Sequence, residues 1–377
     1  MFKKSRVNFN SEIAKFIFDN PANWRKKIKG KHIRFHNKGN RYIFNYETIY
    51  CDYKDPVVQE ARGVILEIDE EIGSISVVCW PFRKFGNYQE SYADNIDWSS
   101  AKVQEKVDGS IIKLYFYDGE WTWATNGMIE AADALTQSSD FMSLIKNCIN
   151  YNKIPYGRLN KDYTYIFELV TKENRVVIDY NEEKLYHLGT RSNISGKECE
   201  EDIGITKPAM YELSSLEACI EAAHALNEGG IVKKEGFVVV DKNYNRVKIK
   251  SPAYLNVHNI ATGCITKKQF LQAISLDIDI SQYITDSLLE IQYLYYKYKY
   301  MEMKRDIEQL LVYARGLYEE YEHDRKAVAL GISKSKYASL MFKDLESNRT
   351  AEEIVKELKY SYVDNAIETY QHKEVWE

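Results

Sequence analysis

The most reactive arrangement in this sequence is a lysine placed between carboxylates and a glycine. The run EKVDGS holds Glu105, Lys106, Asp108 and Gly109, and the apolar run SIIKLYFY begins within it. A lysine amine is a nucleophile only when unprotonated, and a free lysine, with a pKa of about 10.4, is mostly protonated at neutral pH. Partial burial and neighbouring cations would lower that pKa. Taken alone, a Lys-x-Asp-Gly run also occurs by chance, as a polar turn with its lysine in solvent.

Further charged residues follow in an order that favours the chemical interpretation. Lys248 and Lys250 alternate with apolar residues, so a strand would point both to one face, where two cations suit phosphate chemistry and would lower the pKa of Lys106. The alternative is the solvated face of an amphipathic strand. The other members of the order are Arg62–Gly63 and Lys84–Phe85 before Lys106, and Glu168 and Glu235–Gly236 after it.

This order resembles the covalent nucleotidyltransferase superfamily, which contains ATP-dependent ligases and mRNA capping enzymes. Within it, the chain looks most like the RNA ligases of the bacteriophage T4 RNA ligase 1 group. The group-like features are the Arg62–Gly63 pair, the run from Pro81 to Asn87, the run NRVVIDY, and KIKS leading into a helical region. The resemblance spans about residues 40–260 and rests on helical texture after 260. We find no β-rich OB domain there, which DNA ligases and capping enzymes carry.

The resemblance implies an ATP-dependent RNA ligase that seals 5′-phosphate and 3′-hydroxyl RNA ends through a lysyl–AMP and an adenylylated RNA. It implies ATP as cofactor with Mg²⁺, Mn²⁺ being the alternative, because oxygen ligands and phosphates form the preferred shell of such ions. RNA repair, with a nicked tRNA as one candidate substrate, would fit the group. The chain shows no kinase or phosphatase motif, so damaged ends would need a separate healing enzyme.

The resemblance also assigns roles to the cations. Lys106 would be the nucleophile that carries AMP, and Lys248 and Lys250 would be catalytic cations over the phosphates. Arg62 and Lys84 would contact phosphates or ribose. Three more ATP-binding positions follow: Tyr46 near the phosphates, Asp108 organising the loop, and Gly109 letting the backbone approach the nucleotide.

Carboxylates and apolar residues complete the implied ATP site. Glu168 would bind a ribose hydroxyl, and Glu168 and Glu235 would hold the metal ion through water. Leu188 and Val238 would sandwich the adenine, whose edge the main chain of Glu105 would read. Taken alone, these residues are typical of an outward-facing Glu or an ordinary core. Two positions depart from the group: Asn126 stands where a basic residue is frequent, and Gly86 replaces a frequent aromatic.

The elements that must position these residues predict an α+β chain. Residues 101–251 alternate short β-rich runs with polar turns, which indicates an antiparallel sheet with a hairpin at Asp118–Glu120 and a strand at 175–180. Helices are expected over 128–151 and 214–229, the second ending at Gly229. We therefore expect an antiparallel-sheet nucleotidyltransferase (ATP-grasp-like ligase) domain over 1–254, with a basic subregion 1–100, and an all-helical domain over 255–377 with a capping box at Thr350 and Glu353.

Charge and composition limit the alternatives. The net charge is −5, yet residues 1–45 hold twelve Lys and Arg against two Asp and Glu, which suits a local phosphate-binding patch or a solvated surface. Six cysteines without a CxxC pair, no secretory signal and no long apolar run favour a soluble protein of the cytoplasm, or of the host cytoplasm for a viral protein. The sequence leaves the oligomeric state open, and a monomer is the default. An inactive RNA-end-binding relative and a DNA ligase or capping-type nucleotidyltransferase remain alternatives. Nine tyrosines over 283–321 suit either RNA stacking or a helix core.

Overall fold

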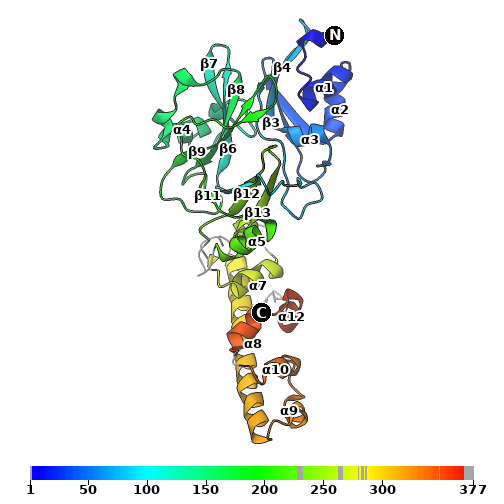
Figure 1. Cartoon of the computed structure of the whole chain (residues 1–377), viewed down its shortest axis with the longest axis vertical. Coiled ribbons are helices and arrows are strands. Elements are labelled where there is room, and N and C mark those ends of the chain that lie inside the picture. Colours follow the sequence, from blue (N-terminus) through cyan, green and yellow to red (C-terminus); the bar gives the residue numbers. More distant parts are fainter. Residues whose placement is uncertain are drawn as a thin grey trace, which may run out of the picture. The chain divides into compact units, whose positions relative to one another are not determined.

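The computed structural model of this chain describes residues 2–136, 138–226, 232–261, 266–278, 280–281, 284, 287–347 and 349–368. The chain divides into two compact units (Figure 1). The first comprises Met1–Leu226 and Lys233–Ser251, and the second comprises Asn227–Val232 and Pro252–Glu377. The first unit contains every strand that the structure describes and every residue of the expected ATP site.

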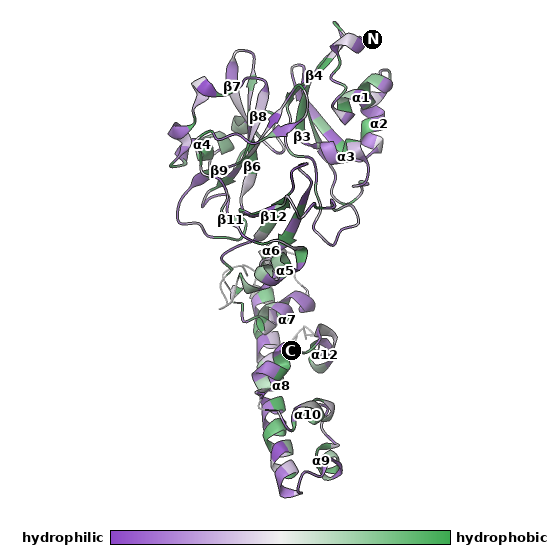
Figure 2. Ribbon diagram, viewed as in Figure 1, coloured by the Kyte–Doolittle hydropathy of each residue, from purple (hydrophilic) through white to green (hydrophobic). Residues whose placement is uncertain are grey.

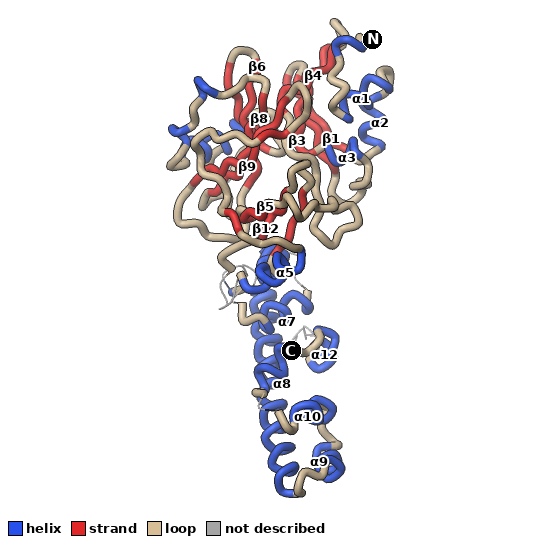
Figure 3. Tube along the Cα trace, in the orientation of Figure 1, coloured by secondary structure: helices blue, strands red, loops and turns tan. Residues whose placement is uncertain are grey.

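The strands of the first unit form three antiparallel sheets (Figure 3). The first sheet has the order β1 (Ile33–Lys38), β2 (Arg41–Tyr46), β3 (Arg62–Asp69), β4 (Ser74–Cys79). The second has the order β10 (Glu198–Cys199), β9 (Lys184–Ser192), β8 (Tyr163–Val170), β6 (Ser110–Tyr117), β7 (Glu120–Thr125). The third has the order β11 (Met210–Tyr211), β5 (Lys102–Glu105), β12 (Gly236–Val240), β13 (Arg246–Lys250). The predicted antiparallel architecture is confirmed.

Short helices cover these sheets. Helices α1 (Glu12–Asp19), α2 (Trp24–Gly30) and α3 (Pro56–Glu60) belong with the first sheet, α4 (Phe141–Asn147) with the second, and α5 (Leu216–Ala225) with the third. Single 3-10 turns lie at Lys4–Arg6, Ala131–Asp133, Tyr151–Lys153 and Tyr156–Arg158. The helix predicted over 128–151 is therefore mostly wrong, because Asp140 caps a short α4 and the Thr136–Ser139 turn precedes it. Helix α5 is confirmed, while Gly229 lies outside the described residues.

Local turn chemistry explains one correct prediction and one error. The β6–β7 hairpin turns at Asp118 and Gly119, which both have positive φ (48° and 85°), as a two-residue turn of this hand requires. The strand predicted at 175–180 is wrong. Val177 and Ile178 donate their amide protons to the Asp108 carboxylate instead of to a neighbouring strand.

Every regular element that the structure describes in the second unit is a helix, as predicted. Its helices are α6 (Pro252–Ala261), α7 (Lys267–Ser275), α8 (Ser287–Glu320), α9 (Arg325–Ile332), α10 (Ala338–Asp344), α11 (Ala351–Lys356) and α12 (Tyr360–Ala366). Apolar and polar residues alternate along α8 in Figure 2, as expected of a helix with one buried face. Of its tyrosines, Tyr293, Tyr296, Tyr300 and Tyr318 are buried, whereas Tyr298 and Tyr313 are exposed. The tyrosine stripe is thus partly helix core.

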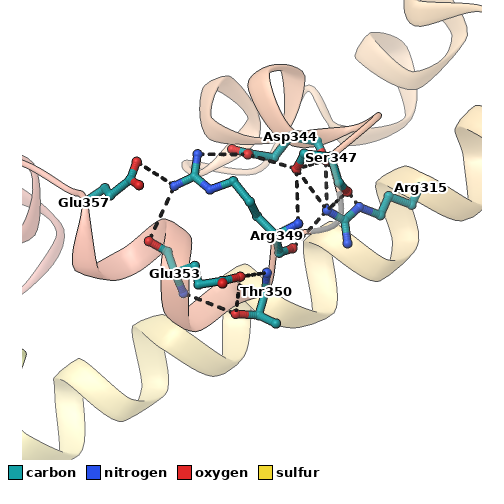
Figure 4. A network of polar contacts seen from close by, with 7 residues as sticks. All are labelled: Arg315, Asp344, Ser347, Arg349, Thr350, Glu353 and Glu357. Carbon is teal, nitrogen blue, oxygen red and sulfur yellow. Dashed lines mark hydrogen bonds and ion pairs between the residues drawn. The ribbon is translucent and has the colours of Figure 1, made fainter.

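A polar network joins α8 to the segment between α10 and α11 (Figure 4). The Arg315 guanidinium donates to the carbonyl oxygens of Asp344 (2.9 Å), Ser347 (2.6 Å) and Arg349 (3.0 Å). Next to it, Thr350 and Glu353 form the predicted capping box of α11. One arginine therefore satisfies the carbonyl groups that follow the end of α10.

Among the described residues, neither a membrane-spanning helix nor a disulfide bond is present. No helix combines the length and apolar character that crossing a membrane requires. The described cysteines, Cys51, Cys79, Cys148, Cys199 and Cys219, are all free thiols.

Candidate functional site

Lys106 lies directly after β5, against the start of β12. Its amide donates to the Gly236 carbonyl oxygen at 2.9 Å, which fixes the lysine beside Glu235. Lys106 Nζ lies 2.7 Å from Glu235 Oε2, and Lys250 Nζ lies 2.8 Å from Glu235 Oε1. Glu235 is only 2% exposed, so a single buried carboxylate binds both lysines.

This pairing sets the protonation of the expected nucleophile. Burial opposes the charge on Lys106, but the carboxylates of Glu235 and Glu168 hold its pKa above the ordinary value. The prediction that burial and the other lysines lower this pKa is therefore wrong for this state, because a carboxylate is in hydrogen-bonding contact with Lys106. Burial likewise opposes the charge on Glu235, yet Lys106 and Lys250 hold the pKa of its carboxyl below the ordinary value. Lys106 is a protonated amine until this pair is broken.

Lys248 has the opposite electrostatic environment. Its Nζ lies 4.6 Å from the centre of the Phe85 ring. Burial and the cations Arg62 and Lys84 lower the pKa of Lys248 to about 6. Bringing a phosphate to this cluster would favour the charged lysine, since fixed cations in a partly buried site stabilise phosphoryl charge.

Arg62 and Lys84 complete the group of cations. Arg62, the first residue of β3, bonds to the Tyr46 side chain and lies 5.3 Å from the Phe85 ring centre. Lys84 Nζ lies 5.4 Å from the ring centre of Tyr46 and 4.7 Å from that of Tyr53. The pKa values of Arg62 and Lys84 are both lowered, and burial is the largest cause. A polyanionic ligand would relieve the repulsion among these cations.

A pocket of about 150 Å³ joins most of the expected site residues. It is lined by Arg62, Phe82, Phe85, Gln104, Glu105, Lys106, Val107, Ile111, Glu168, Leu188, Val238, Arg246, Lys248 and Lys250. Leu188 and Val238 belong to an apolar cluster with Phe82 and Phe85, which suits a flat aromatic base. Five expected residues do not line the pocket, namely Tyr46, Lys84, Asp108, Gly109 and Glu235.

Asp108 and Gly109 lie behind the nucleophile and shape its loop. The Asp108 carboxylate accepts the amide protons of Val177 (2.9 Å) and Ile178 (2.8 Å), the loop-organising role expected of it. A Cβ atom at Gly109 would collide with the Leu169 carbonyl oxygen of β8. The structure thus gives a reason for Gly109 that differs from the expected one, because the close approach is to a neighbouring strand.

Two carboxylates are available for a metal ion. Glu168, on β8, is 7% exposed, and burial raises the pKa of its carboxyl to about 7. Among the described residues, no group of three or more His, Cys, Asp or Glu side chains could hold a metal on its own. Glu168 and Glu235 therefore fit Mg²⁺ or Mn²⁺ only in the mode in which one or two carboxylates act together with waters and substrate phosphates.

Sequence reasoning missed several residues of the region, of which four are aromatic or charged. Phe82 and Phe85 form the apolar floor, and Phe85 was noted only as the neighbour of Lys84. Arg246 alternates with Lys248 and Lys250 on β13, a signal that was available, and it pairs with Glu198 at 2.6 Å. Lys113 is fully buried on β6, and an isolated Lys in an apolar run gave no sign of that burial.

The two departures from the group have local explanations. At Gly86, a Cβ atom would lie 3.2 Å from both Tyr92 and Ala93, so little space is left for a larger side chain. Asn126 lies against Gly63, beside Arg62, where its side-chain oxygen would be 2.8 Å from a Cβ atom on that glycine. The position that lacks the frequent basic residue is therefore still part of the Arg62 environment.

Known proteins similar to this chain were found among both sequences and structures. A baculovirus protein (Autographa californica nuclear polyhedrosis virus), whose name combines a polynucleotide kinase with an RNA ligase, is 34% identical over 254 residues. That match covers 62% of this chain and only 35% of the relative. An RNA ligase of Rhodothermus phage RM378 is 26% identical over 316 residues, covering 67% of this chain and 71% of the relative. An archaeal ATP-dependent RNA ligase structure has a TM-score of 0.44 at 13% identity, covering 63% of each chain.

The family described as RNA ligase matches residues 60–254, which is more than half of the chain. The matched region begins just before Arg62 and ends just after Lys250, so it contains the whole pocket and the Lys106–Glu235–Lys250 arrangement. On this match, the chain belongs to the RNA ligase family of the T4 RNA ligase 1 group.

Proposed function

We propose that this protein is an ATP-dependent RNA ligase that joins a 5′-phosphate end to a 3′-hydroxyl end. The observation that carries the proposal is the position of Lys106. It lies at a pocket lined by Arg62, Lys248 and Lys250, with an apolar slot at Leu188 and Val238. Such a pocket suits a nucleoside triphosphate, whose base is apolar on its faces and whose phosphates are anionic.

The proposed chemistry has three group transfers. Lys106 Nζ, having lost a proton, attacks the α-phosphate of ATP, so that a phosphorus–nitrogen bond forms and pyrophosphate leaves. A 5′-phosphate oxygen of the RNA then attacks the same phosphorus, and the Lys106 amine is the leaving group. Finally the 3′-hydroxyl attacks the RNA 5′-phosphate, a phosphodiester forms, and AMP leaves.

The residues around Lys106 have distinct proposed tasks. Lys248 and Lys250 stabilise charge on the transferring phosphate, and Arg62 and Lys84 bind the remaining phosphates. Glu168 binds a ribose hydroxyl or, with Glu235, holds a divalent ion through water. That ion, when bound, would supply positive charge beside the phosphates. If Glu235 paired with that ion in place of Lys106, the pKa of the Lys106 amine would fall. The attack on ATP requires the unprotonated amine.

The substrate and the setting follow from the same proposal. The RNA carries 5′-phosphate and 3′-hydroxyl ends, and a nicked tRNA is one candidate in RNA repair. A kinase and phosphatase would prepare such ends, and the baculovirus relative, whose name includes a polynucleotide kinase, supports that pairing. We place the protein in the cytoplasm as a monomer. Its free described cysteines are compatible with a reducing compartment.

A ligation assay tests this function. A 5′-phosphorylated RNA, the same RNA with a 5′-hydroxyl, and a matching 5′-phosphorylated DNA are each incubated with ATP and Mg²⁺. We expect joined product from the phosphorylated RNA alone, and none with Lys106→Ala. Lys161→Ala is the matched control, because Lys161 is exposed and lies over the Phe116 ring, outside the pocket.

The other outcomes each identify a different function. RNA binding without any joining would indicate an inactive RNA-end-binding relative. Joining of DNA alone would indicate a DNA ligase. Transfer of GMP from GTP to an RNA 5′-diphosphate would indicate a capping enzyme. Each of these results would refute the RNA ligase proposal.

A further inference from the structure

A lysine without an assigned role lies beneath the phosphate-binding side of the pocket. Lys113 is on β6 and its side chain is fully buried. Ile111, two residues earlier on the same strand, lines the pocket. Because residues i and i+2 of a strand share a face, Lys113 is on the pocket side of the sheet, one step further from the pocket.

The Lys113 amine supports the turn that carries Arg62. Lys113 Nζ donates to the Gly63 carbonyl oxygen at 2.5 Å. Gly63 has φ of +79°, and a Cβ atom there would lie 2.7 Å from Lys113 Nζ, 2.6 Å from the Asn126 carbonyl and 2.8 Å from Asn126 Oδ1. Lys113 and Asn126 therefore enclose the residue that follows Arg62 and leave it little freedom to move.

Stability alone does not account for a lysine at this position. No ion pair of Lys113 with a carboxylate occurs within the described part of the chain. Burial and, to a smaller degree, the Arg62 cation lower the pKa of Lys113 to about 8, with the Cys79 side chain acting in the opposite direction. Well-packed apolar side chains often replace buried ionic groups at little cost in stability, so a buried lysine is weak evidence of a purely structural role. A buried cation that repels Arg62 becomes favourable when a polyanion occupies the pocket.

We propose that Lys113 is a positioning residue for the nucleotide step. It holds Gly63 so that Arg62 points to the phosphates of ATP, and its positive charge adds to that of Arg62. The inference rests on the proposed function, because it takes ATP as the ligand of the pocket. It assigns to Lys113 a share of the positive charge that the group often places at the position of Asn126.

Two variants of Lys113 separate its charge from its hydrogen bond. Lys113→Met removes both at nearly constant volume, and Lys113→Gln keeps a donor without charge. We expect the ATP concentration for half-maximal labelling of Lys106 to rise about tenfold in Lys113→Met and less in Lys113→Gln, since hydrogen bonds to charged groups contribute more than neutral ones. The labelling rate at saturating ATP should stay within about threefold of wild type. Thermal unfolding should show Lys113→Met to be folded, with a modest loss of stability, because the hydrogen bond that it removes leaves the Gly63 carbonyl oxygen unpaired.

A double-mutant cycle with Arg62 tests whether Lys113 acts through it. If it does, Lys113→Met has little further effect in an Arg62→Ala background, because residues that act as a unit are not additive. Lys161→Met is the matched control and should leave ATP dependence unchanged. Equal ATP dependence in wild type and both Lys113 variants, or full additivity with Arg62→Ala, would overturn the assignment while leaving the ligase proposal intact. Absence of label in wild type would refute the ligase proposal and the assignment with it. A Lys113→Met protein that fails to fold would contradict the stability argument, and Lys113→Gln would then decide the ATP dependence.

Discussion

At the scale of single residues, the site is built around one carboxylate that binds two lysines. Glu235 pairs with Lys106 and Lys250, so the expected nucleophile is protonated before ATP binds. The sequence identifies these residues by their order along the chain. It does not give the sign of the pKa change, because that sign depends on which charge lies nearest in space. The burial of Lys113 escaped prediction because the sequence does not show which neighbouring strands cover its side chain.

The raised pKa of Lys106 predicts a pH dependence of adenylylation. The carboxylates of Glu235 and Glu168 hold the Lys106 pKa above its ordinary value, so the unprotonated amine grows with pH throughout the neutral range. We expect the rate of Lys106 labelling to rise by up to about tenfold per pH unit between pH 6 and 8.5, until another step limits it. Single-turnover labelling at ATP concentrations well below saturation measures this, because that rate reports the ionisation of the ATP-free protein. A flat or falling rate over that range would contradict a protonated Lys106.

At the scale of elements, the sequence predicted strands well where alternation and turn residues agree. The β6–β7 hairpin and strands β8, β9, β12 and β13 lie where their apolar runs predicted them. The run at 175–180 has the same composition, but its amides bond to Asp108. Residues 128–151 contain a polar Thr-Gln-Ser-Ser-Asp stretch that starts a new, short helix. In both cases a side chain competed with regular backbone pairing, which local composition does not reveal.

The buried carboxylate of Glu60 contacts the start of α1, and its pKa predicts how the stability of the first unit changes with pH. Glu60, at the end of α3, accepts hydrogen bonds from the Ser11 hydroxyl (2.9 Å) and the Ile13 amide (2.7 Å). Burial raises the Glu60 pKa from 4.5 to about 7. The folded state therefore keeps a proton that the unfolded chain loses above pH 4.5. Wild type should lose about 3 kcal/mol of unfolding free energy as pH rises from 4.5 to 7.

Glu60→Gln removes this titration while keeping an acceptor for both donors. Denaturant unfolding at pH 4.5, 5.5 and 7.5 should therefore show the variant gaining stability relative to wild type as the pH rises. Glu120→Gln, which replaces an exposed carboxyl on β7 away from Glu60, is the matched control and should show no such trend. A constant difference between Glu60→Gln and wild type at all three pH values would mean that Glu60 is ionised when folded.

At the scale of the whole molecule, two compact units share one chain, and only the first contains the pocket. The helical texture after residue 252 was evident from its periodicity and its lack of internal proline. The contacts that hold this unit together were not, because Arg315 bonds to backbone carbonyls 29 to 34 residues away. Periodicity in the sequence predicts which face of a helix is buried. It does not predict which loop packs against that face.

The Arg315 network predicts that the two units respond separately to substitution. Arg315→Ala removes charged donors from three carbonyl groups, which should cost the second unit about 2 kcal/mol. We expect faster proteolysis between α10 and α11, with the rate of Lys106 labelling unchanged. Arg305→Ala, an exposed arginine on the same helix, is the matched control. A loss of labelling in Arg315→Ala that exceeds that of the control would show that the helical unit supports the adenylylation chemistry.

Covalent labelling of Lys106 tests the account most directly. Purified protein, shown to be free of bound AMP, is incubated with α-³²P-ATP and Mg²⁺ without RNA, then denatured and separated on a gel. The account predicts label that survives denaturation in wild type and in Lys161→Ala, is absent in Lys106→Ala, and does not form from α-³²P-GTP. Wild-type protein that takes no label from ATP, or a Lys106→Ala variant that still does, would contradict the central role of this lysine.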